Sequence, residues 1–420
     1  MMLCYRHLSR SAGAVAKSWT AMLNNLQVQK QRSSPAAFST SSVSESVRRY
    51  DLVIVGGGAG GCATAHMFSR KMGRGRVAII EPADVHYYQP LWTLVGGGIK
   101  KIEQSGKPMG SVLPQGCEWI KEKCVEFDPD NSSVTTESGQ LIRYQFLVVA
   151  VGLQLNYHLI KGLPEAFDID PMLCSNYMSK YVVKTRPAME AFKEGNAIFT
   201  FPNTPIKCAG APQKIMYLTE HYFRKVNFRH NLIEVRPEKK EAIFQHLDTL
   251  ETKVFPYEMM HIVPPMSTPK ELWDTPLVDS TGYVTVNRET LQHTKYPNVF
   301  GIGDNTNIPT SKTAAAVASQ TGVLLKNLCS VIAGKEANIE KYDGYTSCPL
   351  VTAPGKCVMA EFDWDGQPLE TFPFDQSKER RTMYHFKQDI FPELYWSLLI
   401  RGRWHGPALI RKALHLGMSR

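Results

Sequence analysis

Tyr50-Asp-Leu-Val-Ile-Val-Gly-Gly-Gly-Ala-Gly-Gly61 is the stretch that decides the fold. Its first six residues predict a short buried strand, and the helical pattern Cys62-Ala-Thr-Ala-His-Met-Phe-Ser69 follows the glycines. In a G-x-G-x-x-G turn the glycines permit a tight turn, an approach of the backbone to a pyrophosphate, and close helix–strand packing. Here they are Gly56, Gly58 and Gly61. A second strand over Val77–Ile80 leads to Glu81, about 20 residues on, where an acid bonds a ribose hydroxyl. An ordinary glycine-rich turn is the alternative, but strand, helix and acid together predict a dinucleotide site.

Two later segments indicate which dinucleotide is bound. Tyr144–Gly152 is an apolar strand that ends in Gly152, and Tyr296–Asp304 is another that ends in an acid just before an alanine-rich helix. With the glycine turn, they resemble the two-dinucleotide-binding-domain flavoproteins, the pyridine nucleotide-disulfide oxidoreductases. The resemblance implies an α/β, FAD/NAD(P)-binding-type fold with two Rossmann-like domains, and FAD as cofactor. It also implies that Asp304 binds the ribitol chain, although Asp304 could cap the helix as well.

The first 46 residues differ in composition from the rest of the chain. The net charge of +9 is uneven, since Met1 to Ser44 contains five Lys or Arg residues, many Ser and Ala, and no Asp or Glu. This composition is typical of a mitochondrial presequence, and the alternative is a disordered basic tail. No stretch approaches the roughly 18 uncharged apolar residues that a spanning helix requires, so we expect no such helix. Nucleic acid is not expected as a partner.

Two of the nine cysteines have distinctive surroundings. No pair has C-x-x-C spacing, so neither a disulfide framework nor a metal site is expected. Cys208 lies between a strand at Ala197–Phe201 and a helix from Gln213 to about Lys225, and a helix N-terminus with neighbouring Lys207 should lower its thiol pKa. This predicts a nucleophilic thiolate. Because no second G-x-G-x-x-G follows that strand, nicotinamide use is not expected. Cys348 lies in a Ser-Cys-Pro loop, which by itself is more often structural than catalytic.

Four stretches resemble the sulfide:quinone oxidoreductase family of animal mitochondria, and the resemblance extends from Tyr50 to the C-terminus. They are Tyr88–Gly96, Phe201–Lys214, Gly301–Asn307 and Tyr342–Leu350. The resemblance, and not the spacing, implies that Cys208 and Cys348 form a redox pair beside the flavin. It further implies that hydrosulfide attacks their bridge and leaves a persulfide, that two electrons pass through FAD to ubiquinone, and that the sulfur leaves to glutathione or sulfite.

The same resemblance suggests further site residues and a membrane partner. Gln89 and Lys312 are expected at the flavin, and Glu165 is a candidate proton acceptor or else a surface carboxylate. Because quinone dissolves in membranes, the segments 386–400 and 404–416, with aromatic and basic side chains, are expected to lie in a headgroup layer. The expected location is the matrix side of the mitochondrial inner membrane, with monotopic attachment. The alternatives are a helical hairpin on its own core and a dimer interface.

The expected domains are a presequence at 1–46, an FAD-binding domain at 47–165 and 270–335, a second Rossmann-like domain at 166–269, and a C-terminal region with amphipathic helices at 336–420. Near 225–231 the second domain is expected to be shortened by one β-α unit of roughly 30 residues, which should reduce stability. Three alternatives stay open: a type II NADH:quinone dehydrogenase-like flavoprotein, a soluble sulfide dehydrogenase with a haem partner, and a non-catalytic FAD-binding splice form.

Overall fold

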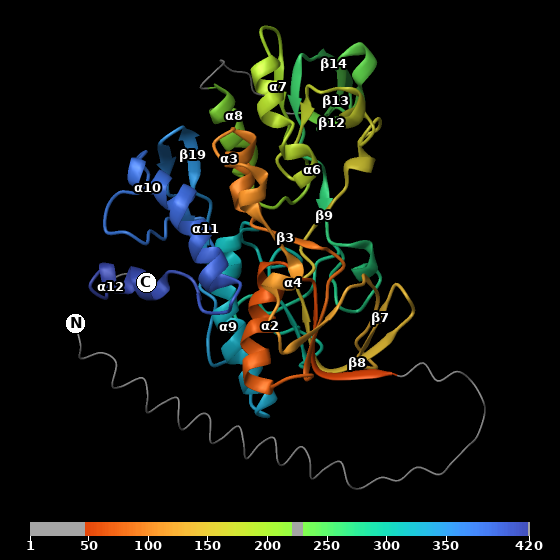
Figure 1. Cartoon of the computed structure of the whole chain (residues 1–420), viewed down its shortest axis with the longest axis vertical. Coiled ribbons are helices and arrows are strands. Elements are labelled where there is room, and N and C mark those ends of the chain that lie inside the picture. The colour runs from red at the N-terminus through yellow and green to blue at the C-terminus, as the bar shows by residue number, and fades with distance from the viewer. Residues whose placement is uncertain (1–46, 221–229, 419–420) are drawn as a thin grey trace. The chain divides into compact units, whose positions relative to one another are not determined.

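The computed structural model describes residues 47–220 and 230–418 (Figure 1). The presequence prediction lies outside these residues, and so does most of the expected junction near 225–231. Val47–Val331 and the described residues from Glu336 onward form one compact unit.

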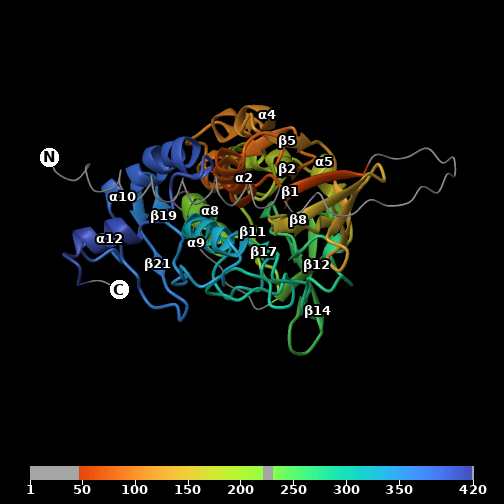
Figure 2. The same ribbon diagram turned by 90° about the horizontal axis from the view of Figure 1, so that it is seen from below.

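The unit is built on a mixed seven-stranded sheet that contains the predicted strands. The strand order is β5-β2-β1-β8-β7-β6, and β17 pairs with the end of β8. Figure 2 shows β5, β2, β1 and β8 next to one another in this order. Strands β5, β2, β1, β8 and β17 are parallel, whereas β6 and β7 are antiparallel. Their bounds are β1 (Arg48–Val55), β2 (Val77–Ile80), β5 (Cys117–Ile120), β6 (Cys124–Asp128), β7 (Ser133–Thr136), β8 (Leu141–Val149) and β17 (Val299–Gly301).

Two helices begin directly after turns at the carboxyl end of this sheet. α2 (Ala59–Met72) follows β1 and packs on β1 and β2, as the glycine turn predicts. α9 (Ala314–Ile332) follows the loop after β17. By length and composition α9 could cross a membrane, but 61 % of its apolar window is buried inside the unit, as in the core helix of a soluble protein. Parallel strands that end at one edge, with helix N-termini beside them, are the usual place for a ligand in α/β proteins.

The second domain contains a small parallel sheet and an antiparallel meander. The parallel order is β10 (Leu173–Cys174), β15 (Met259–His261) and β11 (Ala197–Phe199), and α8 (Ala211–Glu220) follows β11. The meander consists of β12 (His230–Arg236), β13 (Glu241–His246) and β14 (Thr252–Pro256). Among the described strands, β11 pairs with β15 alone and is therefore an edge strand. The shortening of the second domain by one β-α unit stays a prediction.

The C-terminal region begins with two small antiparallel strand pairs and ends in helices. β18 (Thr346–Ser347) pairs with β21 (Glu361–Phe362), and the hairpin of β19 (Leu350–Ala353) and β20 (Lys356–Val358) lies between them in the chain. A nearly continuous helix follows as α10 (Arg381–His385), a π-helical turn (Phe386–Ile390), α11 (Phe391–Leu394) and a second π-helical turn (Tyr395–Leu399), and α12 (Ala408–Leu414) comes last.

The remaining elements are short. They are β3 (Val85–Tyr87), α3 (Trp92–Gly96), β4 (Gly106–Pro108), α4 (Met109–Val112), β9 (Gln154–Leu155), α5 (Ala166–Ile169), α6 (Ser179–Val182), α7 (Thr185–Ala191) and β16 (Met266–Ser267), with 3-10 turns at Gln89–Leu91, Ile102–Ser105, Tyr157–Leu159, Pro237–Lys239 and Lys270–Leu272.

The prediction of two membrane-facing segments is wrong for the aromatic residues of the first. Tyr395 and Trp396 are buried in the core with Tyr88, and Trp404 is partly buried against the same core. Arg411, expected among headgroups, is also buried and bonds Asp343 at 2.9 Å. The amphipathic pattern of a helix is the same whether its apolar side faces the protein core or a membrane. Here the aromatic rings pack in the protein core.

Candidate functional site

The glycine turn after β1 has the geometry that a dinucleotide pyrophosphate needs. Gly56 has φ +103°, and a Cβ there would lie 2.4 Å from the carbonyl oxygen of Ala150. A Cβ on Gly61 would lie 1.8 Å from the carbonyl oxygen of Gly56, so these two positions admit only glycine. Gly58 has open space where a Cβ would be, which leaves that side of the turn free for a ligand. The first N–H groups of α2 begin here and favour an anion.

Glu81 bonds this turn, and Gly152 follows the neighbouring strand β8. Glu81 lies just beyond β2, and its carboxylate accepts hydrogen bonds from the Gly57 N–H at 2.5 Å and the Ala83 N–H at 2.7 Å. Gly152, with φ +66°, donates its N–H to Oδ1 of Asn305 at 3.2 Å. The end of β8 is therefore tied to the loop that follows β17.

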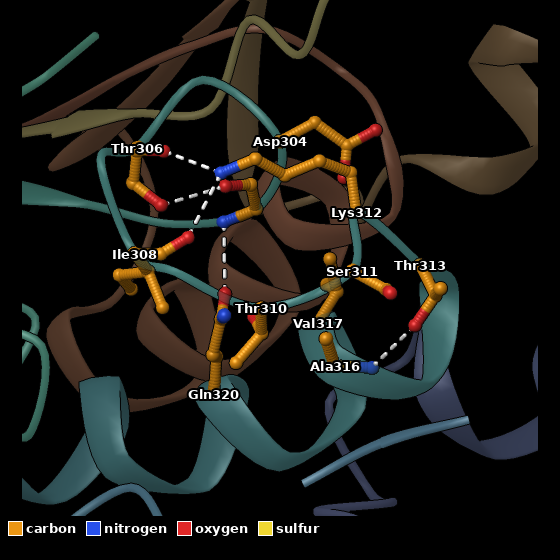
Figure 3. A pocket seen from close by; sticks show the side chains of 11 residues that line it. Asp304, Thr306, Ile308, Thr310, Ser311, Lys312, Thr313, Ala316, Val317 and Gln320 are labelled. Carbon is orange, nitrogen blue, oxygen red and sulfur yellow. Dashed lines mark hydrogen bonds between the residues drawn. The ribbon is translucent and has the colours of Figure 1, made fainter. Parts of the chain in front are cut away.

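That loop forms a small pocket around Asp304 and Lys312 at the start of α9 (Figure 3). Burial raises the pKa of Asp304, opposed by the charges of Lys312 and Lys207. Burial also lowers the pKa of Lys312 to about 8, while its ammonium donates to the carbonyls of Thr306 at 2.6 Å and Ile308 at 3.1 Å. The helix is capped by Thr313, whose Oγ1 accepts the Ala316 N–H at 3.1 Å. Capping by Thr313 leaves the carboxylate of Asp304 available for a ligand hydroxyl.

The structure brings Cys208 and Cys348 together from loops 140 residues apart. Cys208 precedes α8, Cys348 follows β18, and their sulfur atoms lie 3.4 Å apart. Gly210 packs against the pair, since a Cβ at this position would lie 2.7 Å from Sγ of Cys348. A disulfide has an S–S length of about 2.05 Å, so a small movement of the loops suffices to form the bridge.

Lys214 is a site residue that the sequence reasoning missed. Its side chain comes from the first turns of α8 and is only 2 % exposed. The ammonium donates to Sγ of Cys348 at 3.1 Å and to Sγ of Cys208 at 3.5 Å. Burial acts to lower its pKa, but the negative charge of the two cysteines outweighs burial and raises it. No sequence pattern marks Lys214, because its role depends on the loop of Cys348, which is 134 residues away in the chain.

The nucleophilic thiolate at Cys208 stays a prediction, because Cys208 and Cys348 share one hydrogen bond and the Lys214 ammonium contacts both sulfur atoms. The hydrogen bond between the two sulfur atoms, reinforced by Lys214, lowers the pKa of Cys348 well below its usual value. The same hydrogen bond, with burial, raises the pKa of Cys208. The ammonium of Lys207, the expected cation, bonds Oε1 of Gln89 at 2.7 Å. Burial lowers the pKa of Lys207 to about 8.

Lys387 is a second cation that the sequence reasoning missed, and it comes from the C-terminal helix. It is 3 % exposed and donates to the carbonyl of Pro90 at 2.7 Å. Burial and the charge of Lys214 lower its pKa to about 8, while the negative charges of Cys208 and Cys348 oppose this shift. The C-terminal region therefore contributes a charge to the cysteine site.

Within the described part of the chain, no hydrogen bond links Glu165 to Cys208 or Cys348. It is exposed and lies at the N-cap of α5, beside the buried Ala166 and Phe167. Its role as a proton acceptor stays a prediction.

Comparisons with known proteins agree with this architecture. Residues 50–185 match the family described as pyridine nucleotide-disulphide oxidoreductase. The chain is 50 % identical to the mitochondrial sulfide:quinone oxidoreductase of Mus musculus over 94 % of this chain and 96 % of that protein. It is 41 % identical to the protein of the same name from Dictyostelium discoideum, over 84 % and 87 %. The X-ray structure of the Aquifex aeolicus sulfide:quinone oxidoreductase matches with a TM-score of 0.67 at 18 % identity, covering 89 % of this chain and 96 % of that one, which shows the fold alone.

The mouse alignment also bears on the length of this chain. It extends over 433 positions, more than the 420 residues present here, so part of it lies opposite gaps in this chain. This supports a missing segment but does not locate it.

Proposed function

The chain belongs to the mitochondrial sulfide:quinone oxidoreductase family, and from this premise we propose that it oxidises hydrogen sulfide and passes two electrons to ubiquinone. The observation that carries the proposal is the cysteine pair, with sulfur atoms 3.4 Å apart and the Lys214 ammonium within 3.5 Å of both. Such a pair can take a sulfur atom from hydrosulfide and release two electrons.

We infer that FAD is the cofactor, because three observed features fit it. Gly58 leaves room for the pyrophosphate, Glu81 lies where a ribose hydroxyl would bind, and Asp304 lines a pocket beside the cysteine loop. FAD supplies an acceptor that joins two-electron thiol chemistry to quinone chemistry. Gln89 and Lys312 would border it, with Gln89 held by Lys207.

In the proposed reaction, hydrosulfide attacks the disulfide between Cys208 and Cys348. The S–S bond breaks, one cysteine becomes a persulfide and the other leaves as a thiolate. Lys214 stabilises the thiolate on either sulfur, because its ammonium contacts both. Transfer of the outer persulfide sulfur to an acceptor leaves a second thiolate. When the two thiolates form the S–S bond again, they release two electrons, which bound FAD would accept. The neighbouring ammonium groups of Lys207 and Lys387 favour an anionic acceptor, such as glutathione or sulfite.

We infer that the membrane contact is confined to the end of the chain. Leu409 and Leu416 are 84 % and 83 % exposed, and the exposed Lys412 lies between them. Exposed leucines with a basic neighbour suit the headgroup layer of a membrane that contains quinone. The matrix side of the mitochondrial inner membrane is the proposed location, in keeping with the names of the relatives.

Anaerobic addition of sulfide to the purified protein tests the proposal. We expect sulfide to bleach the flavin absorbance and a soluble ubiquinone analogue to restore it. Cys208→Ser and Cys348→Ser should each retain FAD but lose the bleaching. A yellow protein that sulfide never bleaches would instead favour a non-catalytic FAD-binding form. Bleaching by NADH would favour the type II dehydrogenase, although Cys208 stands where its second fingerprint is expected.

A further inference from the structure

The backbone of Cys208 has a conformation that is uncommon for a residue with a side chain. Its φ is +49°, in the left-handed region, which non-glycine residues rarely adopt unless their surroundings impose it. The direction of the Cα–Cβ bond depends on this conformation. Relaxation of Cys208 to a negative φ would turn Sγ away from its present position, 3.4 Å from Sγ of Cys348.

Three hydrogen bonds hold this conformation. The Cys208 N–H donates to the carbonyl of Lys312 at 2.8 Å, and the Ala211 N–H donates to the carbonyl of Cys208 at 2.8 Å. The third comes from a side chain, because the hydroxyl of Tyr177 donates to the same carbonyl at 3.2 Å. The first bond ties Cys208 to the loop of the Asp304 pocket, the second to α8, and the third to the segment after β10.

Tyr177 is well placed to act as a fixed donor. It is 3 % exposed and packs in a small apolar cluster with Ile206, Ala211 and Met266. Burial, with the nearby charges of Cys208 and Cys348, raises its pKa well above the usual value. The hydroxyl therefore keeps its proton whichever cysteine is charged. A buried hydroxyl contributes a hydrogen bond of stable geometry, because its apolar neighbours fix the ring.

We propose that Tyr177 is a positioning residue whose hydroxyl holds the Cys208 carbonyl, and so keeps the Cys208 sulfur in the place where it bridges to Cys348. The inference rests on the proposed function only in that the two cysteines form a disulfide. Tyr177 touches neither sulfur through any hydrogen bond of the described residues, and it acts through the backbone of Cys208.

The test compares Tyr177→Phe with a matched control, Tyr157→Phe. Tyr157 is 4 % exposed, and its hydroxyl bonds Oγ of Ser175 at 2.7 Å rather than Cys208. Each full-length variant is equilibrated in buffers of oxidised and reduced glutathione, where one disulfide forms at the expense of two thiols and releases two molecules of reduced glutathione. Alkylation and peptide mass spectrometry then give the fraction of bridged Cys208–Cys348.

We expect the equilibrium constant for bridge formation to fall about three- to tenfold in Tyr177→Phe, the range for loss of one hydrogen bond. Tyr157→Phe should keep the wild-type constant, although it loses an equally buried hydroxyl. An unchanged constant in Tyr177→Phe, an equal fall in both variants, or no bridge in the wild type would each overturn the inference. The measurement uses neither sulfide nor quinone, so a protein that forms the bridge but does not oxidise sulfide would contradict the proposed function alone.

Discussion

The charge state of the cysteine pair depends on one buried cation. The Lys214 ammonium lies 3.1 Å from Sγ of Cys348, and the pKa of Cys348 is well below its usual value because of its hydrogen bond with Cys208 and this charge. An opposite charge at this distance changes a pKa by about 1–3 pH units. The reactivity of Cys348 should therefore vary little between pH 7 and 9 in the reduced wild-type protein.

Lys214→Met should make the reactivity of Cys348 depend on pH between pH 7 and 9. We expect the pKa of Cys348 to rise, so that its alkylation by iodoacetamide becomes about tenfold slower at pH 7 and accelerates with pH up to 9. Lys214→Arg keeps the charge, so the reactivity of Cys348 should again vary little between pH 7 and 9. Lys180→Met, which removes an exposed lysine, should behave as wild type. A pH profile for Lys214→Met that coincides with that of the wild type would refute the assignment of Lys214.

Gly210 leaves space for the sulfur of Cys348. A methyl group at this position would lie 2.7 Å from that sulfur, so Gly210→Ala must displace one of the two loops. We expect sulfide to reduce the flavin about ten- to a hundredfold more slowly, because a misplacement of the reacting atoms by about 1 Å can slow a reaction by about a hundredfold. The FAD content should not change. Gly110→Ala is the control, since its methyl group would make an ordinary contact at 3.5 Å with Trp119. Equal reduction rates in both variants would contradict this interpretation.

At the scale of elements, the sequence predicted the strands and helices whose formation depends on residues close together in the chain. The strand, glycine turn and helix at β1–α2 are found as expected, because Gly56 and Gly61 are required by contacts within this turn and with Ala150. Lys214 and Lys387 could not be assigned, since their roles depend on a partner loop distant in sequence. The hydrogen bond between Cys208 and Cys348, which raises the pKa of Cys208, could not be predicted for the same reason.

The C-terminal segments also show that the spacing of residues in a sequence does not determine what a helix packs against. Tyr395 and Trp396 have the spacing of an interfacial helix, yet they pack beside His86 and Tyr88. Ile390 and Leu398 are 44 % and 38 % exposed, but the most exposed large apolar side chains of these segments, Leu409 and Leu416, lie on α12 and just after it. Deletion from Phe386 would therefore damage the core as well as the surface, and point substitutions on α12 are the better test.

Leu409→Asp combined with Leu416→Asp should release the protein from liposomes that contain anionic lipid. Each leucine is more than 80 % exposed, so the change should hardly affect folding but should remove apolar surface from the membrane contact. Leu247→Asp combined with Leu250→Asp serves as the control, because these exposed leucines lie in the turn between β13 and β14. Equal sedimentation of the two double variants with liposomes would place the membrane contact elsewhere.

At the scale of the whole molecule, a buried histidine ties the glycine turn to the C-terminal helix. His86 is 3 % exposed, with Nδ1 2.8 Å from the carbonyl of Gly57 and Nε2 2.6 Å from the hydroxyl of Tyr395. Burial lowers its pKa to about 4. The unfolded chain therefore binds a proton below pH 6.5 that the folded protein does not bind until about pH 4.

The free energy of unfolding should consequently fall as the pH drops from about 6.5 to 4. A difference of one pH unit between the folded and unfolded pKa values corresponds to about 1.4 kcal/mol, so His86 alone accounts for roughly 3 kcal/mol at the acid end of this window. His86→Gln should be less stable at pH 7 but should show a shallower fall, as measured by urea unfolding at several pH values. The same slope in the variant and the wild type would show that His86 does not titrate in this way.

The second domain should be the first part of the molecule to open. Among the described strands β11 pairs with β15 alone, whereas β1 is paired on both sides by β2 and β8. An edge strand with few partners opens at a lower free energy than a central strand.

Because Cys208 lies between β11 and α8, sulfide-dependent bleaching should be lost on warming before FAD is released. We expect amides of β11 to exchange hydrogen faster than those of β1. Equal protection of β11 and β1, together with loss of bleaching only when FAD leaves, would mean that the second domain is as firmly folded as the rest.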